Sequence, residues 1–181
     1  MLRNPLTWLL LLIASTALAA CCGSVPCDCR DELDDALIFQ FNLDASTPTS
    51  PGFNVSELGT VYIRRVPLDT AQRPRADTVA ITGGRRDYVQ TVLINNNTPF
   101  PQSSSRKLNG YRYKIYVGTR KAPTDTFSIT NVVLNDTTEA DGCCSCNANV
   151  RKNLRVNGQF FDLADPSGND RPDTVLLNRK R

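Results

Sequence analysis

The residues of this chain with the most chemistry available to them are its seven cysteines, which fall into two clusters. Four lie in CCGSVPCDC, between Cys21 and Cys29, and three lie in CCSC, at Cys143, Cys144 and Cys146. Cysteine side chains can form disulfides, bind soft metal ions or attack electrophiles. The first question that the sequence raises is which of these reactions the clusters serve.

Histidine, the side chain most often used in catalysis near neutral pH, is absent from the chain. Its absence excludes Ser-His-Asp and Cys-His catalysis and histidine metal sites. The carboxylates of Asp34-Asp35 are consecutive and would point to opposite faces of a strand. The pair Gly83-Gly84 precedes two arginines rather than the start of a helix that could bind phosphate. The sequence therefore predicts a protein that is not an enzyme and holds no cofactor.

Residues 1–20 have the layout of a secretory signal peptide. Arg3 gives the start a positive charge, the apolar stretch LTWLLLLIA follows, and the small residues STALAA come last. The apolar stretch is shorter than the roughly 20 residues that a membrane-spanning helix needs. We expect residues 1–20 to be removed during export.

The sequence Leu18-Ala19-Ala20-Cys21 resembles the lipobox of bacterial lipoproteins. In that family the cysteine is acylated through sulfur and the chain is cut directly before it. The resemblance implies that Cys21 carries lipid and anchors the exported protein to a membrane of the cell envelope. Cys22 stands where some lipoproteins carry an aspartate for inner-membrane retention, which favours the outer membrane. The alternative is an ordinary signal-peptidase site at Ala17-Leu18-Ala19.

Setting Cys21 aside leaves an even number of cysteines, as expected if the others pair in an oxidising compartment. The disulfide candidates are Cys22, Cys27, Cys29, Cys143, Cys144 and Cys146. Pairing within a cluster strains the preferred geometry, so the spacing favours bridges between the clusters without choosing a connectivity. The alternative is a thiolate metal site or redox centre made of the same cysteines, although the spacing differs from that of C-x-x-C zinc knuckles.

Asp-Thr pairs recur along the chain, with threonines at Thr70, Thr78, Thr137 and Thr174. They are similar to the acceptor motif of the general O-glycosylation systems of some Gram-negative envelopes, which modify the threonine of exported proteins. The simpler interpretation is structural. Aspartate favours turns and threonine favours strands, so each pair would mark a junction between a loop and a strand.

The elements that must position these residues show alternation at a period of two rather than helical spacing. In ALIFQFNL, 36–43, the alternate residues Leu37, Phe39, Phe41 and Leu43 share one face. Further strands are predicted within 60–66, 88–94, 111–117, 125–134 and 155–163. The last of these is a hairpin, because Asn157-Gly158 supplies the positive φ angles of a two-residue turn.

The chain is therefore predicted to be all-β. We expect a single-domain two-sheet β-sandwich, with a small β-barrel as the alternative. The proline-rich segment 67–75 is expected to cross between the sheets. Around the sandwich, residues 36–178, we expect the signal peptide, a disordered, cysteine-rich acidic tether at 21–35 and a disordered basic tail at 179–181.

The charge is nearly balanced, with 21 Lys and Arg against 18 Asp and Glu, which argues against nucleic acid as a partner. The leading hypothesis is a lipid-anchored, non-enzymatic structural or interaction module of the envelope. Beyond the lipobox the chain resembles uncharacterised small envelope lipoproteins, a resemblance that carries no known activity. An alternative is a carbohydrate- or peptide-binding protein, which would expose the aromatic residues Tyr62, Tyr88, Phe100, Tyr111 and Tyr113.

Overall fold

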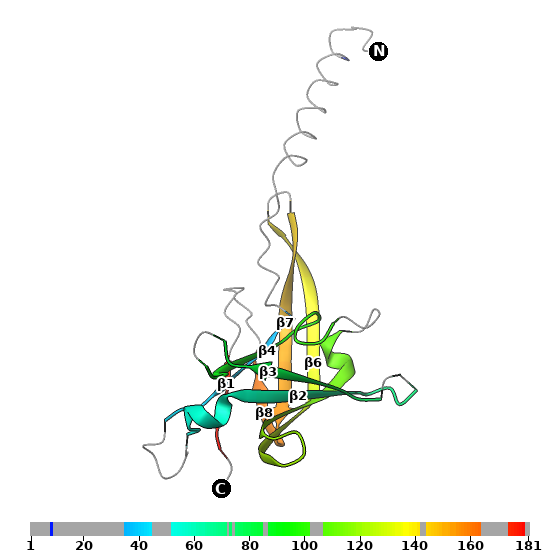
Figure 1. Cartoon of the computed structure of the whole chain (residues 1–181). Helices are drawn as coiled ribbons and strands as arrows, with labels where there is room; N and C mark the ends of the chain where they lie inside the picture. Colours follow the sequence, from blue (N-terminus) through cyan, green and yellow to red (C-terminus); the bar gives the residue numbers. More distant parts are fainter. Residues whose placement is uncertain are drawn as a thin grey trace.

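The computed structural model describes residues 8, 35–44, 52–71, 73, 75–84, 87–101, 107–141, 144–163 and 174–179. Within them the chain forms, in order, β1 (Leu37–Phe41), η2 (Val55–Leu58), β2 (Thr60–Pro67), β3 (Asp77–Thr82), β4 (Thr91–Ile94), η3 (Leu108–Gly110), β5 (Tyr111–Gly118), β6 (Pro123–Asp141), β7 (Cys144–Val156), β8 (Gln159–Asp162) and β9 (Thr174–Leu177). The elements η2 and η3 are short 3-10 helices. Figure 1 shows their arrangement.

The described strands form two open sheets. One has the order β4-β1-β9, and the other has the order β3-β2-β5-β6-β7-β8. Every pairing is antiparallel except that of β1 with β9, which joins the two ends of the described fold in parallel. The predicted all-β, two-sheet fold is confirmed, and neither sheet closes into the barrel that was the alternative.

Apolar side chains from both sheets meet in one core, because each strand turns alternate residues inward. In β1 the residues Leu37, Phe39 and Phe41 are buried, as the alternation predicts, and Leu43 packs partly buried against the core. The large sheet contributes Val61, Ile63, Ile115, Val117, Phe127, Ile129, Leu154 and Val156. The burial of these apolar side chains is the main contribution to the free energy that holds the two sheets together.

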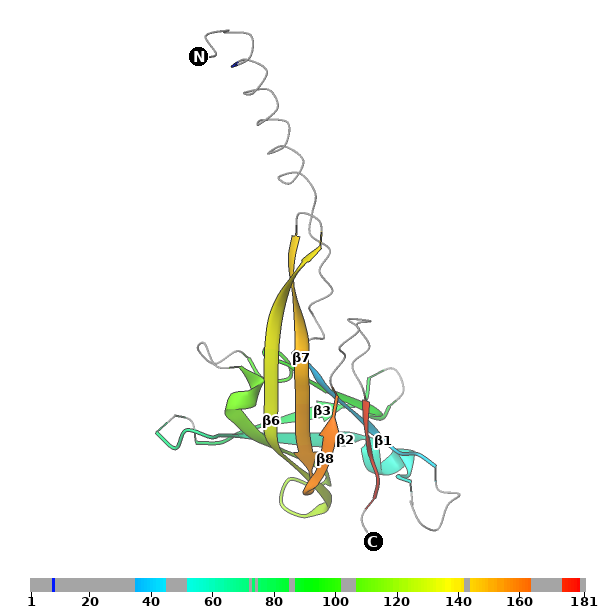
Figure 2. The ribbon, with the colours of Figure 1, turned by 180° about the vertical axis from the view of Figure 1, so that it is seen from behind.

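The strands β6 and β7 continue beyond the sheets as a twisted two-stranded ribbon (Figures 1 and 2). We call its outer part, residues 135–141 and 144–151, the arm. Strand β5 accompanies β6 only over residues 123–129, and β8 accompanies β7 only over 153–156. A register shift between Asn135 and Asp136 marks the base of the arm, where the twist of the ribbon can increase.

Local turn chemistry explains the other end of β7. Asn157 and Gly158 have φ angles of 52° and 89°, and they link Val156 of β7 to Gln159 of β8. This is the predicted hairpin, and it is confirmed. A second asparagine in the left-handed region, Asn131 with φ 52°, lies at another register shift in β6, where the side chain tolerates a conformation that is costly for most residues.

One expectation about connectivity needs correction, and some strands were missed. Segment 67–75 does not cross between sheets, because it joins β2 to β3, which are adjacent antiparallel strands of the same sheet. The strands β3 and β9, and β7 before residue 155, were not among the strands predicted from alternation. Among the described residues, no helix has the length and apolar character required to cross a membrane.

Candidate functional site

The two described cysteines lie at the tip of the arm. Cys144 begins β7, and its backbone pairs with that of Asp141, while Cys146 pairs with Glu139. Both cysteine side chains are half-buried and Ser145 between them is exposed, as expected for alternate residues of a strand. Cys144 and Cys146 are disulfide-bonded. A sulfur in a disulfide is not a thiolate, so in this state neither residue is a metal ligand or a nucleophile.

The remaining cysteines of the prediction, Cys21, Cys22, Cys27, Cys29 and Cys143, lie outside the described residues. So do Lys180 and Arg181, and every residue of the predicted signal peptide, 1–20, except Trp8. Within the described part, no group of three or more His, Cys, Asp or Glu side chains is placed to hold a metal ion. The identity of the bridges, and the lipid on Cys21, therefore stay predictions.

A polar cluster joins the start of β1 to the base of the arm. The Lys107 ammonium is hydrogen-bonded to Asp136 of β6 and lies 3.6 Å from the nearer carboxylate oxygen of Asp35. Asn96 donates to Asp35 at 2.8 Å and accepts from the Leu108 backbone at 2.8 Å. The hydrogen bond with Asp136 raises the pKa of Lys107, the charge of Asp35 adds to this, and burial opposes it. Asp35 was assigned to the tether, but these contacts make it part of the folded domain.

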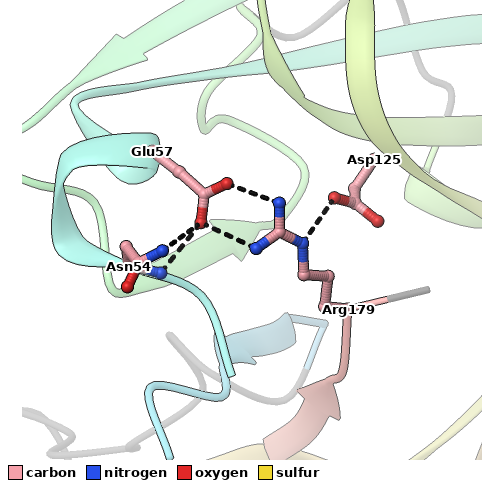
Figure 3. Close-up of polar contacts among 4 residues, drawn as sticks. All are labelled: Asn54, Glu57, Asp125 and Arg179. Carbon is pink, nitrogen blue, oxygen red and sulfur yellow. Dashed lines mark hydrogen bonds and ion pairs between the residues drawn. The ribbon is translucent and has the colours of Figure 1, made fainter. Parts of the chain in front are cut away.

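A second polar cluster brings the C-terminal segment together with η2 and the start of β6 (Figure 3). The two terminal nitrogens of Arg179 donate to the two oxygens of Glu57, at 2.7 and 3.3 Å, and its Nε lies 3.6 Å from Asp125. Glu57 in turn accepts from the Asn54 backbone at 2.9 Å. Arg179 was assigned to a disordered tail, so this is a correction. Arg179 ties the end of the described chain to η2 and β6.

The aromatic residues proposed for ligand binding do not form an exposed patch. Phe100, Tyr111 and Tyr113 are buried, and Tyr88 packs partly buried against the core. The Arg65 guanidinium lies over the rings of Phe100 and Tyr111, at 4.5 and 5.0 Å from their centroids.

The fifth member of that set, Tyr62, stacks on Tyr116 of the neighbouring strand, with ring centroids 5.3 Å apart. The aromatic faces are therefore engaged within the domain. Their burial removes the observation that motivated a carbohydrate- or peptide-binding function.

The hydroxyl of buried Tyr113 makes stability depend on pH. It donates to the Leu108 carbonyl at 2.9 Å, and burial raises its pKa while the charge of Arg65 opposes the rise. The folded protein therefore keeps this proton at a pH where the unfolded chain releases it. We expect the free energy of unfolding to fall above about pH 10, by up to about 1.4 kcal/mol per pH unit for this group. Deprotonation of Lys107 should also lower the free energy of unfolding as the pH rises, because its pKa is raised in the folded protein.

The variant Tyr113→Phe tests this expectation by urea denaturation at neutral pH and at about pH 11. At neutral pH the variant should have a free energy of unfolding lower by about 1 kcal/mol, because the hydrogen bond to Leu108 is gone. Between neutral and alkaline pH its free energy of unfolding should fall less than that of the natural protein. An equal decline in the variant and the natural protein would contradict the assignment to Tyr113.

The four Asp-Thr sites lie in different surroundings. Thr70 is exposed in a turn, in which Asp69 accepts from the Ala71 backbone at 2.9 Å. Thr78, Thr137 and Thr174 lie in strands β3, β6 and β9, the first two half-buried and the last exposed. Three of the four threonines thus lie in strands rather than at loop tips. Thr70 is the one of the four that is both exposed and in a turn, which favours it as a candidate for glycosylation.

Sequence reasoning missed both polar clusters. Lys107 and Arg179 reach partners that are far from them in the chain, such as Asp35 and Glu57. Neither lysine nor arginine carries a local signal that identifies a distant partner. The one local sign was the spacing of Asn54 and Glu57, which is typical of a capped helix start.

No protein-family model, curated protein or solved structure matches the chain. The function must therefore be inferred from its own residues and their arrangement.

Proposed function

We propose that this protein is a lipid-anchored, non-enzymatic module of the bacterial cell envelope, held in the outer membrane through Cys21 and stabilised by disulfides. Its role would be structural or would rest on interaction with another envelope component. The observation that carries the proposal is the arm. A ribbon that projects from a compact two-sheet core and has disulfide-bonded cysteines at its tip suits a mechanical or spacing role.

Three features support this proposal. The lipobox-like Leu18-Ala19-Ala20-Cys21 follows a signal-like leader. The disulfide-bonded Cys144 and Cys146 fit an oxidising compartment, where such bonds persist. The charged clusters that the structure describes are engaged in ion pairs between elements, which suits a role in holding the fold.

The anchor is tested by the variant Cys21→Ser, with Ser24→Ala as a control that leaves the lipobox intact. We expect the natural protein and the control to partition into the detergent phase of a Triton X-114 extract. The Cys21→Ser chain should partition into the aqueous phase, because the acceptor sulfur is gone. The intact mass of the natural protein should correspond to a chain that begins at Cys21 and carries acyl groups. A mass without acyl groups, beginning at Ala20, would instead support the ordinary signal-peptidase site.

The interaction role is tested separately. Chemical crosslinking in intact cells, followed by affinity capture of the natural protein and of the Cys21→Ser variant, should yield an envelope protein or glycan that depends on anchoring. Turnover of a substrate by the purified protein, with no captured partner, would overturn the non-enzymatic assignment.

A further inference from the structure

We propose that the outer face of the large sheet binds a linear polysaccharide that carries phosphate or carboxylate groups. The residues that would bind it, which we call the basic face, are Arg64, Arg112, Lys114 and Arg155. The inference rests on the interaction role in the proposed function, for which it names a class of partner. It does not depend on a lipid at Cys21.

Strands β2 and β5 place three cations side by side on the face that is turned away from the core. Ile63 and Ile115 are fully buried and opposite each other, so the next pair along, Arg64 and Lys114, lies on the outer face. Arg112 is two residues before Lys114 on β5 and shares this face. All three cations are exposed. Opposite residues have Cβ atoms about 5 Å apart and alternate residues of a strand lie about 6.6 Å apart, so the three charges are close neighbours.

The same face continues across β6 to β7. Arg155 is exposed, follows the buried Leu154 and pairs with Thr130 of β6, so it also lies on the outer side. It is about 10 Å from β5, because β6 lies between the two strands. Its guanidinium donates to the Gly158 carbonyl at 2.8 Å and lies 5.9 Å from the ring centroid of Phe160, and neither partner carries a net charge. The basic face is therefore a stripe that crosses four adjacent strands.

The described carboxylates leave this positive charge largely uncompensated. Five of them are ion-paired with three cations outside the basic face: Asp77 with Arg65, Glu57 and Asp125 with Arg179, and Asp35 and Asp136 with Lys107. Within the strands of the large sheet below the arm, the register places one carboxylate, Asp162 of β8, on the same side as the four cations. The basic face therefore has an excess of positive charge, and charge complementarity requires an anionic partner.

The pairing of Arg64 with Lys114 makes this requirement local. Like charges directly opposite each other in a sheet are destabilising. An anionic group bound between them replaces this repulsion by two attractions, because the guanidinium and the ammonium both donate charge-assisted hydrogen bonds to phosphate or carboxylate oxygens. We therefore expect the pair to form the strongest part of the site.

The dimensions of the basic face favour a flexible polymer over a single anion or a bilayer. From β2 to β7 the stripe spans three strand spacings, or about 14 Å, which is more than one phosphate or carboxylate can contact. A sheet also twists from strand to strand, so its face does not lie flat against a planar membrane over this length. A linear polymer with repeated anionic groups can follow the twist and contact the cations in turn.

The residues between the cations favour a polysaccharide. Ser128 and Thr130 of β6 pair with Lys114 and Arg155 respectively, so their hydroxyls lie on the basic face, where they can donate to and accept from sugar hydroxyls. Single-stranded nucleic acid would instead require exposed aromatic faces on which its bases could stack. Binding here would depend on charge and hydroxyl groups, so it does not need the aromatic rings that the fold has buried.

The purified Cys21→Ser protein, titrated calorimetrically with polygalacturonate at low ionic strength, tests the basic face. This polymer is a linear polysaccharide with one carboxylate on each sugar, and its fully methyl-esterified form has the same backbone without the charge. We expect binding to the first and none to the second. Combining Arg64→Gln with Lys114→Gln should weaken binding about tenfold or more, because charge-assisted hydrogen bonds are lost. Added salt should also weaken it.

The matched control combines Arg120→Gln with Lys121→Gln. These exposed residues lie in the connection between β5 and β6, and their replacement lowers the net charge by the same amount. The affinity of the control should change less than about twofold. Equal losses in the two double variants would overturn the proposal, because binding would then depend on net charge alone. Equal binding of the methyl-esterified polymer would also overturn it.

Two further probes separate the classes of partner. Poly-L-glutamate carries carboxylates on a peptide backbone, and vesicles of phosphatidylglycerol and phosphatidylcholine present an anionic membrane. Tighter binding of either probe than of polygalacturonate would overturn the assignment to a polysaccharide.

Two features keep this test decisive. If the Arg64 and Lys114 variant fails to fold, the comparison of charged and esterified polymers still decides for the unsubstituted basic face. The protein used has no acyl acceptor at residue 21, so a failure of binding is distinct from a failure of the anchor, which Triton X-114 partitioning measures.

Discussion

Replacing Phe127 by alanine is expected to lower the free energy of unfolding by about 3–5 kcal/mol, the largest loss from any single substitution considered for this protein. Phe127 is buried on β6, and its ring contacts those of Phe41 and Phe53 edge to face, each at 6.2 Å between centroids. Phe41 belongs to the small sheet and Phe127 to the large one, so this cluster joins the two layers. Truncation leaves a cavity and removes both ring contacts.

Urea denaturation followed by circular dichroism measures this loss. The matched control is Phe160→Ala, the same substitution at an exposed ring of β8, where Arg155 lies 5.9 Å from the ring centroid. We expect the control to lose no more than about 1 kcal/mol, as for an exposed cation–π contact. Because domains are typically stable by only about 5–15 kcal/mol, Phe127→Ala should leave part of the population unfolded at moderate temperature. A loss no larger than that of the control would contradict the position of Phe127 between the layers.

The second large effect is expected for Arg179→Met, which should cost about 1–3 kcal/mol. This range lies between the values for exposed and buried ion pairs, because Arg179 is partly exposed while the side chain of Asp125 is only 5% exposed. The substitution removes a two-point contact with Glu57 and leaves two carboxylates without this counter-charge. It also releases the end of β9 from η2 and β6.

Thermal or urea denaturation at low and high salt checks this prediction, with Lys121→Met as an exposed control. The control should change stability by less than about 0.5 kcal/mol. Arg179→Lys should be intermediate, because lysine keeps the charge but has no planar fork to contact both oxygens of Glu57. If Arg179→Met and Lys121→Met are indistinguishable, the cluster contributes little, and the C-terminal segment is held by the pairing of β9 and by the Asn42–Asn178 hydrogen bond.

Much of the strand content could be predicted because each strand carries its own pattern. The alternation of Leu37, Phe39 and Phe41 requires one buried face, and this face is the buried one. Asn157-Gly158 specified its hairpin locally, since few residue pairs adopt positive φ at both positions. Strand β9 was missed because four residues with two apolar positions carry too little pattern to identify.

The sequence by itself determined the all-β class, the inward faces of the main strands and the clustering of the cysteines. These properties depend on the period of the side chains and on spacing along the chain, which are local. It could not determine that β2 and β3 share a sheet, or that β6 and β7 extend beyond their neighbouring strands as an arm. Nor could it determine that Lys107 contacts both Asp35 and Asp136. Only the tertiary structure decided these contacts, because each joins residues distant in sequence, and their free energy depends on which surfaces are buried together once the sheets have packed.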